Sequence, residues 1–397
     1  MRAQTTAEGA SVDVSQLVTS PIPHAPWSQE ASDDVRARLV LDDIHDIALR
    51  TADVVVIGAG IAGLSAACTL GAAGLHTIVL DAAPEIGYGA TGRNAGILSA
   101  GINMGLADLP GDSPEREMWP ATTRLLLSLV KEGAAAGALL SASRTGALSL
   151  AETRTAARHL AREARARNAL SLCAEMWDAS QVADATGGRL NTSSLVAALW
   201  LPDEGRVQPL TLLAHYAEKA RGAGATLAGN ARVLSYEAQG GGRKRSWRLL
   251  VDGGTVIVTR GLIVATGPTQ EPTARIFALA FDAHLPASFP LFWDAAPYTY
   301  CDYRPGDGYL VTSGGRYGRA GGSTRDGVYH KRLAEAARYW LPELAHAEPT
   351  HGWAVDLAVS ADMVPHIRAL GDQAPGFAVE GLGALGVLPG IVLGEQA

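Results

Sequence analysis

Lysine and cysteine are both scarce in this chain of 397 residues. Four lysines occur, so arginine supplies most of the 33 basic side chains, and 40 acidic side chains leave a net charge of −7. An acidic balance argues against a general nucleic-acid surface, because binding to a phosphate backbone needs an excess of positive charge. We therefore expect small-molecule partners rather than nucleic acid.

The few cysteines also limit the class of protein. Cys68, Cys173 and Cys301 lie far apart and form no Cys-x-x-Cys pair, which disfavours a disulfide framework or a zinc site. The first 30 residues contain no apolar segment of the kind found in secretion signals. Apolar runs elsewhere are short or broken by glycine and proline, below the ~18 residues that a membrane-spanning helix needs. These absences predict a cytoplasmic protein with no metal site and no membrane span.

Glycine and apolar residues, by contrast, are plentiful. The chain has 45 glycines and 47% hydrophobic residues, a globular composition, and it is long enough for two domains. The polar start of residues 1–50 predicts an N-terminal arm that packs on the body. Residues 113–200 predict mainly helices, including "SSLVAALWL" at 193–201, because apolar positions recur three and four apart. Several runs after residue 230 alternate apolar and polar residues and predict strands.

The spacing Gly-x-Gly-x-x-Gly occurs three times, at residues 58–63, 87–92 and 381–386. The first match has the context of a dinucleotide site, since a β-branched run at 53–57 precedes it and a helical composition follows. Asp81 then ends the next predicted strand, where an acidic side chain meets the adenosine ribose. This β-α-β unit predicts phosphate binding at the helix N-terminus.

The other two matches predict different roles. The second lies in "GYGATGRNAGI" at 87–97 and has no strand directly before it, so it predicts a loop that passes close to a ligand. Arg93 is available there to a phosphate or carboxylate, although an ordinary surface loop is the alternative. The third match leaves no room for a second strand and acid before Ala397, so we expect it to complete a site that other segments build.

These segments together resemble the D-amino-acid-oxidase-like FAD-dependent oxidoreductases. The resemblance rests on "DVVVIGAGIAGLSAACTL", Asp81, "GATGRNAG" at 89–96, "LIVATGP" and the terminal glycine-rich turn. The chain is similar to the gamma-glutamylputrescine-oxidase-like and glycine-oxidase-like branches, the first through "PWSQ" before the first strand. The resemblance implies an α/β fold, with a discontinuous Rossmann-type FAD-binding domain and an α+β substrate domain that has a mixed or antiparallel sheet. The expected segments are 1–50 for the arm, 51–105, 205–270 and 346–397 for the FAD-binding domain, and 106–204 and 271–345 for the substrate domain.

The resemblance further implies FAD as the cofactor, with backbone groups supplying most contacts. The first motif would cradle the pyrophosphate, the block at 89–96 would lie beside pyrophosphate and flavin, and the backbone of Val233 would hold the adenine. The implied cofactor residues are Gly58, Ala59, Gly60, Ile61, Ala62, Gly63, Asp81, Ala82, Gly89, Ala90, Thr91, Arg93, Asn94, Ala95, Gly96, Ile97, Val233, Ala265, Thr266, Gly267, Gly383, Ala384, Leu385, Gly386 and Val387.

The terminal turn departs from the family pattern. Where the family has aromatic, hydroxyl and histidine side chains facing the flavin, Gly381–Val387 has leucine, glycine and leucine. Backbone N–H groups and the helix dipole could still stabilise negative charge on the reduced flavin. Side-chain chemistry from this turn is absent, so a flavin-binding protein with little catalysis stays an alternative. An NAD(P)-dependent dehydrogenase that uses the first motif alone is a second alternative.

The reaction implied by the resemblance is oxidation of a C–N bond in an amine or amino acid, by hydride transfer to flavin N5. Tyr303 and Arg304 match a family position that faces the substrate. Arg304 would bind a carboxylate bidentately, and Tyr300 or Tyr303 would wall the pocket, whereas sheet packing is the alternative for both tyrosines. Cys301 loosely matches a cysteine that holds FAD covalently, but we favour an inert thiol and non-covalent FAD.

None of the four lysines matches the lysine that activates oxygen in some branches of the family. The electron acceptor is therefore oxygen or another molecule, and the oligomeric state stays open.

Overall fold

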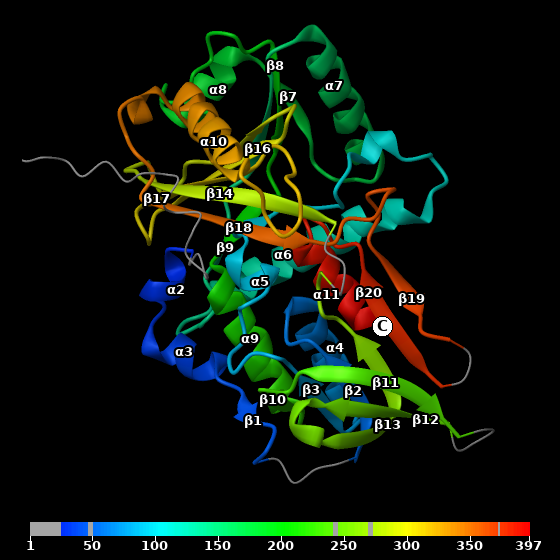
Figure 1. Cartoon of the computed structure of the whole chain (residues 1–397). Helices are drawn as coiled ribbons and strands as arrows, with labels where there is room; N and C mark the ends of the chain where they lie inside the picture. The colour runs from blue at the N-terminus through cyan, green and yellow to red at the C-terminus, as the bar shows by residue number, and fades with distance from the viewer. Residues whose placement is uncertain (1–24, 47–50, 241–244, 269–272, 372–373) are drawn as a thin grey trace, which may run out of the picture.

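The computed structural model describes residues 25–46, 51–240, 245–268, 273–371 and 374–397. Within these residues the strands form two large sheets and one small sheet, which Figure 1 shows with helices packed around them. The small sheet consists of β4 (Ile97–Leu98), β9 (Gly205–Val207) and β5 (Ala142–Arg144).

The first large sheet is built on the β-α-β unit that the sequence predicts. β2 (Thr51–Ile57) and β3 (Thr77–Leu80) pair in parallel, and α4 (Ile61–Ala72) connects them. Its core strands run as continuous apolar segments, as expected for a parallel sheet covered on both faces. The remaining strands are β1 (Asp42–Asp43), β10 (Thr226–Gly229), β11 (Val233–Gln239), β12 (Ser246–Val251), β13 (Val256–Val264), β19 (His366–Ala369) and β20 (Gly376–Glu380).

The second large sheet has the strand order β18-β14-β17-β16-β15-β6-β8-β7. Its neighbours pair antiparallel except for β15 and β6, which pair in parallel, so the sheet is mixed. The strands are β6 (Ala147–Ala151), β7 (Glu175–Trp177), β8 (Ala197–Leu201), β14 (Ala274–Asp282), β15 (Leu291–Asp294), β16 (Thr299–Arg304), β17 (Tyr309–Gly314) and β18 (His351–Leu357).

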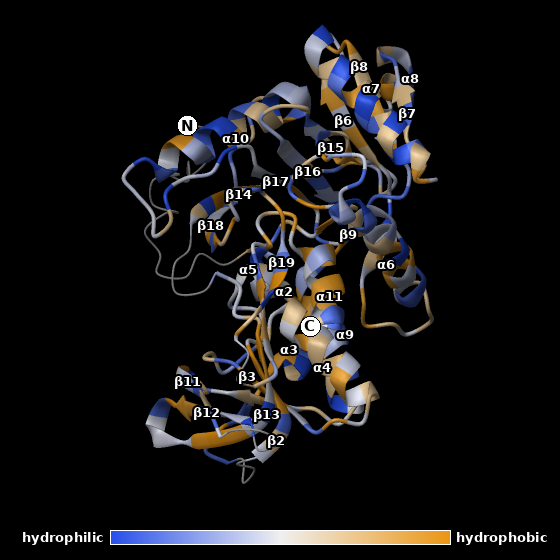
Figure 2. Ribbon diagram, turned by 90° about the vertical axis from the view of Figure 1, so that its right-hand side faces the viewer, coloured by the Kyte–Doolittle hydropathy of each residue, from blue (hydrophilic) through white to orange (hydrophobic). Residues whose placement is uncertain are grey.

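The helices divide between the two sheets. α4 and α11 pack closely because Gly394 has no side chain, and a Cβ there would stand 2.3 Å from the carbonyl oxygen of Ala62. In Figure 2 α11 is largely coloured as hydrophobic, whereas α7 carries bands of both kinds. The other helices are α2 (Trp27–Glu30), α3 (Asp33–Leu39), α5 (Ala90–Arg93), α6 (Met118–Gly133), α7 (Arg154–Ala169), α8 (Ala179–Thr186), α9 (Pro209–Gly222), α10 (Asp326–Trp340) and α11 (Val387–Gln396), with 3-10 turns η1 (Leu106–Asp108), η2 (Pro114–Glu117), η4 (Asp252–Gly254) and η5 (Pro342–Leu344).

One secondary-structure prediction was wrong. "SSLVAALWL" was predicted as helical, but its second half forms strand β8, which pairs with β6 and β7. Both faces of β8 are covered, so its apolar run lacks the alternation that identifies a strand. Tertiary pairing therefore decided the structure of this segment.

The domain boundaries stay a prediction. The segment 346–397 supplies strands to both large sheets, since β18 joins the second sheet while β19 and β20 join the first. Of the predicted arm, 1–24 and 47–50 lie outside the described residues, and 25–46 contain α2, α3 and β1. No helix within the described ranges has the length and apolar character to span a membrane.

Candidate cofactor site and adjoining pocket

The first glycine motif has the local geometry of a phosphate-binding turn. Gly58 has φ +105°, and a Cβ there would stand 2.5 Å from the carbonyl oxygen of Ala265 on the neighbouring strand. A Cβ on Gly63 would stand 1.9 Å from the Gly58 carbonyl oxygen, so both positions require glycine. Asp81 fixes the same turn, because its carboxylate accepts the backbone N–H of Ala59 at 2.8 Å.

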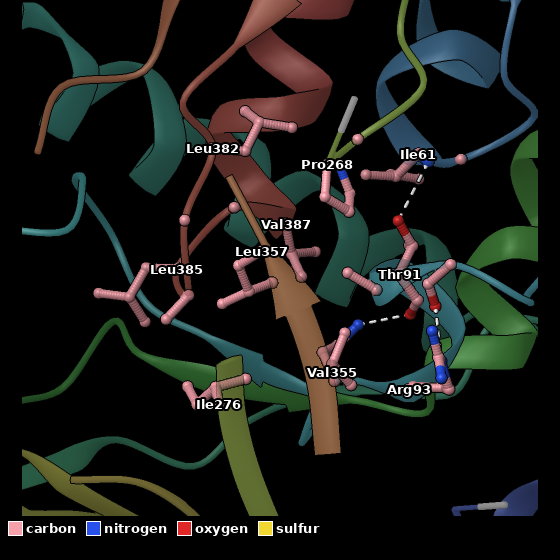
Figure 3. Close-up of a pocket in the computed structure, with 18 of the residues that line it drawn as sticks. Ile61, Thr91, Arg93, Pro268, Ile276, Val355, Leu357, Leu382, Leu385 and Val387 are labelled. Carbon is pink, nitrogen blue, oxygen red and sulfur yellow. Dashed lines mark hydrogen bonds between the residues drawn. The ribbon is translucent and has the colours of Figure 1, made fainter. Parts of the chain in front are cut away.

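A pocket, here called the first pocket, opens at this turn. The N-terminus of α4, the glycine block (residues 89–96), the end of β13 and the terminal loop (residues 381–387) form its walls, together with β14 and β18 (Figure 3). The structure thus brings together three motifs that are far apart in sequence. The predicted cofactor residues that line it are Gly60, Ile61, Ala62, Gly89, Ala90, Thr91, Arg93, Asn94, Ala95, Ile97, Ala265, Thr266, Gly267, Gly383, Ala384, Leu385, Gly386 and Val387.

One end of the first pocket is polar. The Thr91 hydroxyl accepts the backbone N–H of Ile61 at the start of α4, a helix with no side-chain cap from its own N-cap residue Gly60. Arg93 is half-buried, and among the described residues no carboxylate lies within ion-pair distance of its guanidinium. Burial lowers the pKa of Arg93, against the attraction of Asp356. A cation without an ion-pair partner at the wall that also holds the N-terminus of α4 fits an anionic group such as the FAD pyrophosphate.

The other end of the first pocket is apolar. Ile276 from β14, Val355 and Leu357 from β18, and Leu385 and Val387 from the C-terminal region project into it (Figure 3). The N-terminus of α11 also faces this end, and its N-cap residue provides no side-chain cap. A flat aromatic ring system with one polar edge fits such a surface, because apolar walls cover its faces and a helix N-terminus meets its edge.

Three side chains from distant segments fix the glycine block. The Trp27 indole donates to the Gly92 carbonyl at 2.9 Å, and the Trp353 indole donates to the Arg93 carbonyl at 2.8 Å. Arg304 donates to the Ala95 carbonyl at 2.8 Å and lies over the Trp27 ring, 4.5 Å from its centroid. The block is thus held by backbone contacts that its own sequence does not reveal.

This geometry assigns Arg304 a different position from the predicted one. Arg304 is 4% exposed, and its guanidinium bonds the Ala95 and Val207 carbonyls near Asp302 and Asp307. It lines neither pocket described here, so its predicted contact with a substrate carboxylate gains no support and stays a prediction. A buried arginine that holds the backbone and one that binds substrate have the same sequence signature.

Of the other residues predicted near the substrate or the flavin, two lie in the core and one lines the pockets. Tyr303 is 5% exposed and packs in the core of the second sheet. Cys301 is fully buried, bonds the Thr312 hydroxyl at 3.6 Å, and has its pKa raised by burial to about 12. Tyr300 lines both pockets, so of the three predicted substrate residues it is the one placed at the site.

A second pocket adjoins the first, and the two share Ile276, Tyr300, Ala384 and Leu385 in their walls. Its other walls come from residues 99–105, α7, and loops near 293–298 and 314–317, none of which carries a local motif. The aromatic and cationic residues between 292 and 317 indicate substrate contacts in that run, but Tyr300 is the one wall residue outside the first pocket's motifs that they single out, and residues 99–105 and α7 give no signal. Nothing in the local pattern of Tyr298, Arg316 or Tyr317 distinguishes them from surface residues.

Unpaired donors occupy one side of the second pocket. Arg316 is exposed to it and has no ion-pair partner among the described residues. Tyr298, Tyr300 and Tyr317 also line it, and burial raises the pKa of each phenol, so these hydroxyls stay protonated near neutral pH. This side can therefore donate hydrogen bonds to an anionic group.

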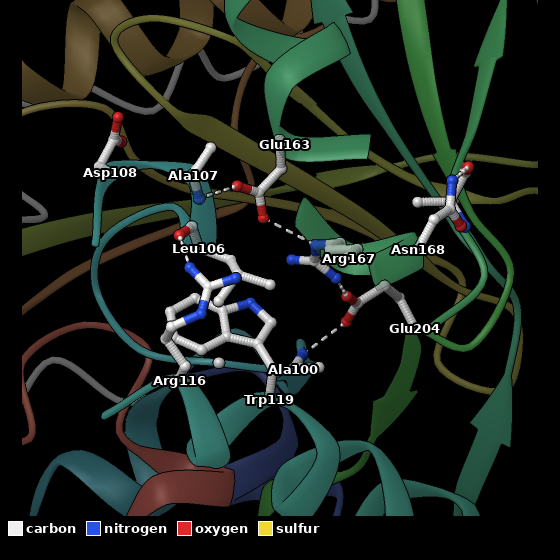
Figure 4. Close-up of polar contacts among 12 residues, drawn as sticks. Ala100, Leu106, Ala107, Asp108, Arg116, Trp119, Glu163, Arg167, Asn168 and Glu204 are labelled. Carbon is white, nitrogen blue, oxygen red and sulfur yellow. Dashed lines mark hydrogen bonds and ion pairs between the residues drawn. The ribbon is translucent and has the colours of Figure 1, made fainter. Parts of the chain in front are cut away.

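The wall of the second pocket also includes part of a buried ionic network, which Figure 4 shows. Arg167 lies between two carboxylates, 2.8 Å from Glu163 and 3.0 Å from Glu204. Burial alone would lower the pKa of Arg167, but the two carboxylates outweigh burial and raise it. Burial raises the pKa of Glu204, although the attraction of Arg167 opposes that change. Glu163 and Arg167 thus form a polar part of the wall, and their charges interact with each other and with Glu204.

Some predicted cofactor residues stand outside the wall of the first pocket. Ala82 follows Asp81 behind the first turn, and Val233 begins β11 in the outer part of the first sheet. Gly96 lies against Arg304, because a Cβ there would meet the guanidinium. Their contacts with the cofactor stay a prediction. The predicted residues outside the wall are Gly58, Ala59, Gly63, Asp81, Ala82, Gly96 and Val233.

Sequence comparisons identify relatives of this chain. A model of the DAO family, described as FAD dependent oxidoreductase, matches residues 53–397. The protein named Probable oxidoreductase OrdL from Rhizobium meliloti is 25% identical over 343 residues, which are 80% of this chain and 76% of that protein. Gamma-glutamylputrescine oxidoreductase from Escherichia coli is 42% identical over 83 residues, 21% of this chain and 18% of that protein.

Solved structures share the fold. Glycine oxidase from Geobacillus kaustophilus superposes with a TM-score of 0.74 at 19% identity, covering 87% of this chain and 93% of that one. Iminodiacetate oxidase from Chelativorans sp. BNC1 gives a TM-score of 0.69 at 24% identity, covering 86% and 93%. The predicted Rossmann-type α/β fold with a second, mixed sheet is thereby confirmed. With a family match over most of its length and a pocket that fits the cofactor, the chain belongs to the DAO family of FAD-dependent oxidoreductases.

Proposed function

We propose that this chain uses non-covalently bound FAD to oxidise a C–N bond of an amino acid, or of an amine that carries a carboxylate. The observation that carries the proposal is the second pocket, which meets the first across Tyr300, Ala384 and Leu385. A substrate in it would lie against the apolar end of the first pocket. The glycine oxidase and the iminodiacetate oxidase that share the fold are named for substrates with both nitrogen and carboxylate groups.

Arg316 replaces Arg304 as our candidate partner for the substrate carboxylate. It lines the second pocket with no carboxylate within ion-pair distance among the described residues, and Tyr298 and Tyr317 line the same pocket. A guanidinium with neighbouring O–H donors suits a carboxylate, because a carboxylate accepts its strongest hydrogen bonds from charged and bidentate donors. The carboxylate would then fix which carbon of the substrate is presented to the cofactor.

The chain's own groups bind and orient the substrate in this account. Bound FAD supplies the two-electron acceptor that takes a hydride from the carbon bearing nitrogen. A neutral amine needs no strong base once it is oriented for the reaction. The apolar side chains of Ile276 and Leu385, which line both pockets, would exclude water from the place where the pockets meet. The covalent alternative through Cys301 has little support, since that thiol is buried among core residues and lines neither pocket.

A substitution at Arg316 tests the carboxylate assignment. We expect Arg316→Ala to raise the KM for a carboxylate-bearing substrate about tenfold or more while the KM for a simple amine changes little, because one charge-assisted contact is lost. Arg319→Ala is the matched control, since Arg319 is an exposed arginine nearby that lines neither pocket. Equal KM values for Arg316→Ala and wild type would remove Arg316 from the substrate site.

The two alternatives make different predictions for the purified protein. An NAD(P)-dependent dehydrogenase would be colourless and would bind nicotinamide nucleotide. A flavin-binding protein with little catalysis would be yellow, but no amine would reduce it. Membership in an oxidoreductase family and the joined pockets favour oxidation of a substrate. The cytoplasmic location and the electron acceptor, oxygen or another molecule, also stay proposals.

A further inference from the structure

The terminal loop separates the two pockets, yet its side chains provide no polar anchor of their own. Ala384 and Leu385 line both pockets. Gly381 and Gly383 have φ of +71° and +61°. Glycine adopts this conformation at little cost in energy, but it adopts others as readily, so the sequence of the loop does not fix its backbone. Something outside the loop must therefore fix its conformation.

Asn103 supplies the side-chain part of that anchor, beside a backbone bond from the Gly383 N–H to the Ala358 carbonyl at 3.0 Å. Its amide donates to the Leu382 carbonyl at 3.0 Å and accepts the Leu385 N–H at 3.0 Å. Gly383 lies under the amide, and a Cβ there would stand 2.6 Å from both amide heteroatoms. One side chain thus spans the loop, and the glycine at its centre makes room for that side chain.

The segment that carries Asn103 is itself fixed by side chains. Between β4 and η1 it has little secondary structure, so its backbone groups bond to distant residues instead (Figure 4). Glu204 accepts the Ala100 N–H at 2.8 Å, and Glu163 accepts the Ala107 N–H at 2.8 Å. Arg167 joins these two carboxylates, so one ionic network holds both ends of the segment.

The position of the loop matters for the start of α11. The first N–H groups of a helix have no partner inside it, and within the described residues Gly386 and Val387 donate to no protein acceptor. Both residues line the first pocket. Because Leu385 bonds to Asn103, the N–H groups that follow it stay directed at the pocket.

We propose that Asn103 is a positioning residue, which sets the terminal loop and the N-terminus of α11 against the cofactor from the wall of the substrate pocket. It takes over the anchoring that the apolar side chains of this loop cannot provide. The proposal rests on the proposed function, because the cofactor in question is FAD. The buried network of Arg167 with its two glutamates makes the anchor rigid.

Hydrogen exchange on the apoprotein tests the anchor without the cofactor. In Asn103→Ala we expect the amide of Leu385 to exchange about tenfold faster, since its acceptor is lost. Asn103→Asp keeps an acceptor for that N–H and should retain most of the protection. Unchanged exchange in Asn103→Ala would overturn the proposal, whether or not the protein proves to be an oxidase.

FAD titration and the reduction potential test the effect on the cofactor. Asn103→Ala should weaken FAD binding about tenfold, and the potential of bound FAD should become more negative because a helix N-terminus no longer faces it firmly. Asn168→Ala is the matched control, because Asn168 also donates to and accepts from one backbone position, Ala174, outside both pockets.

A merely structural role for Asn103 would give a different pattern. Asn103→Ala and Asn168→Ala would then lower thermal stability alike while the FAD dissociation constant and potential stayed at their wild-type values. That result would overturn the proposal. Failure of every variant and of the wild type to bind FAD would instead overturn the proposed function, whereas the exchange result at Leu385 would still stand.

Discussion

Arg93 is the residue whose environment is most informative about the cofactor. It is a half-buried cation that lines the same pocket as the N-terminus of α4, without a carboxylate in ion-pair distance among the described residues. A protein keeps such a charge at a cost unless an anion neutralises it. The family pattern allowed this residue to be predicted from sequence, since the glycine block has a characteristic composition.

Removal of the Arg93 charge should weaken cofactor binding. We expect Arg93→Gln to raise the dissociation constant of FAD about tenfold to a hundredfold, as for loss of one charge-assisted hydrogen bond. Fluorescence titration of the apoprotein measures this directly. Arg93→Lys should lose less, because it keeps the charge. Equal FAD affinity in wild type and Arg93→Gln would show that the phosphates bind elsewhere.

His330 allows a prediction about pH. Its imidazole is buried on α10 and contacts the Trp353 carbonyl at 3.1 Å, while no residue in the described part of the chain bonds its Nδ1. Burial lowers the pKa of His330 below the ordinary value of 6.5, although the bond to Trp353 opposes that change. As pH falls below 6.5, the unfolded chain takes up a proton that the folded chain does not.

The free energy of unfolding should therefore decrease as pH falls from about 7 to about 5. In His330→Gln the decrease should be smaller, because the proton uptake of this residue is gone. His215, whose pKa burial also lowers, contributes the same slope to both proteins. Urea unfolding at several pH values measures the two slopes, and parallel curves for wild type and variant would contradict the assignment.

At the scale of elements, local motifs were predictable and long-range partners were not. The β2-α4-β3 unit could be read from a β-branched run, a glycine turn and Asp81, because all its determinants are contiguous. The strand β8 could not, because its covered faces give no alternation. Most of the second pocket's wall also carries no motif, since it comes from loops, helices and strands of several distant segments.

The short helix α2 offers a test of such a long-range contact. Trp27→Phe replaces the indole by a smaller aromatic ring and removes the N–H that holds the Gly92 carbonyl. We expect a loss of about 1 kcal/mol in stability and a severalfold weaker FAD affinity, because the glycine block loses one of its anchors. Trp177→Phe is the control, since that indole bonds to exposed Glu175.

Thermal melting with and without FAD separates the two effects. If the contact supports the glycine block, Trp27→Phe should lose affinity for FAD whereas Trp177→Phe should not. The same loss of affinity in both variants, or in neither, would contradict a role for α2 in the cofactor site. The two variants remove the same chemical group, so their comparison isolates its position.

At the scale of the whole molecule, the terminal loop explains how a third glycine motif serves one cofactor site. It is not an independent phosphate-binding turn. It closes a pocket whose wall begins at Gly60, after the chain has passed through both large sheets, and Asn103 helps to hold it there. The sequence indicated that the loop must complete a distant site, but not which residue anchors it, because that anchor lies in a segment without regular structure.

The measurement that tests the central claim most directly is anaerobic reduction of the purified yellow protein by a panel of amines and amino acids. The account predicts that the flavin band near about 450 nm bleaches with at least one carboxylate-bearing amine, as two electrons pass to FAD. It also predicts that Arg316→Ala slows this bleaching at low substrate concentration. A protein that purifies without flavin and cannot be loaded with FAD, or a loaded protein that no member of the panel reduces, would contradict it.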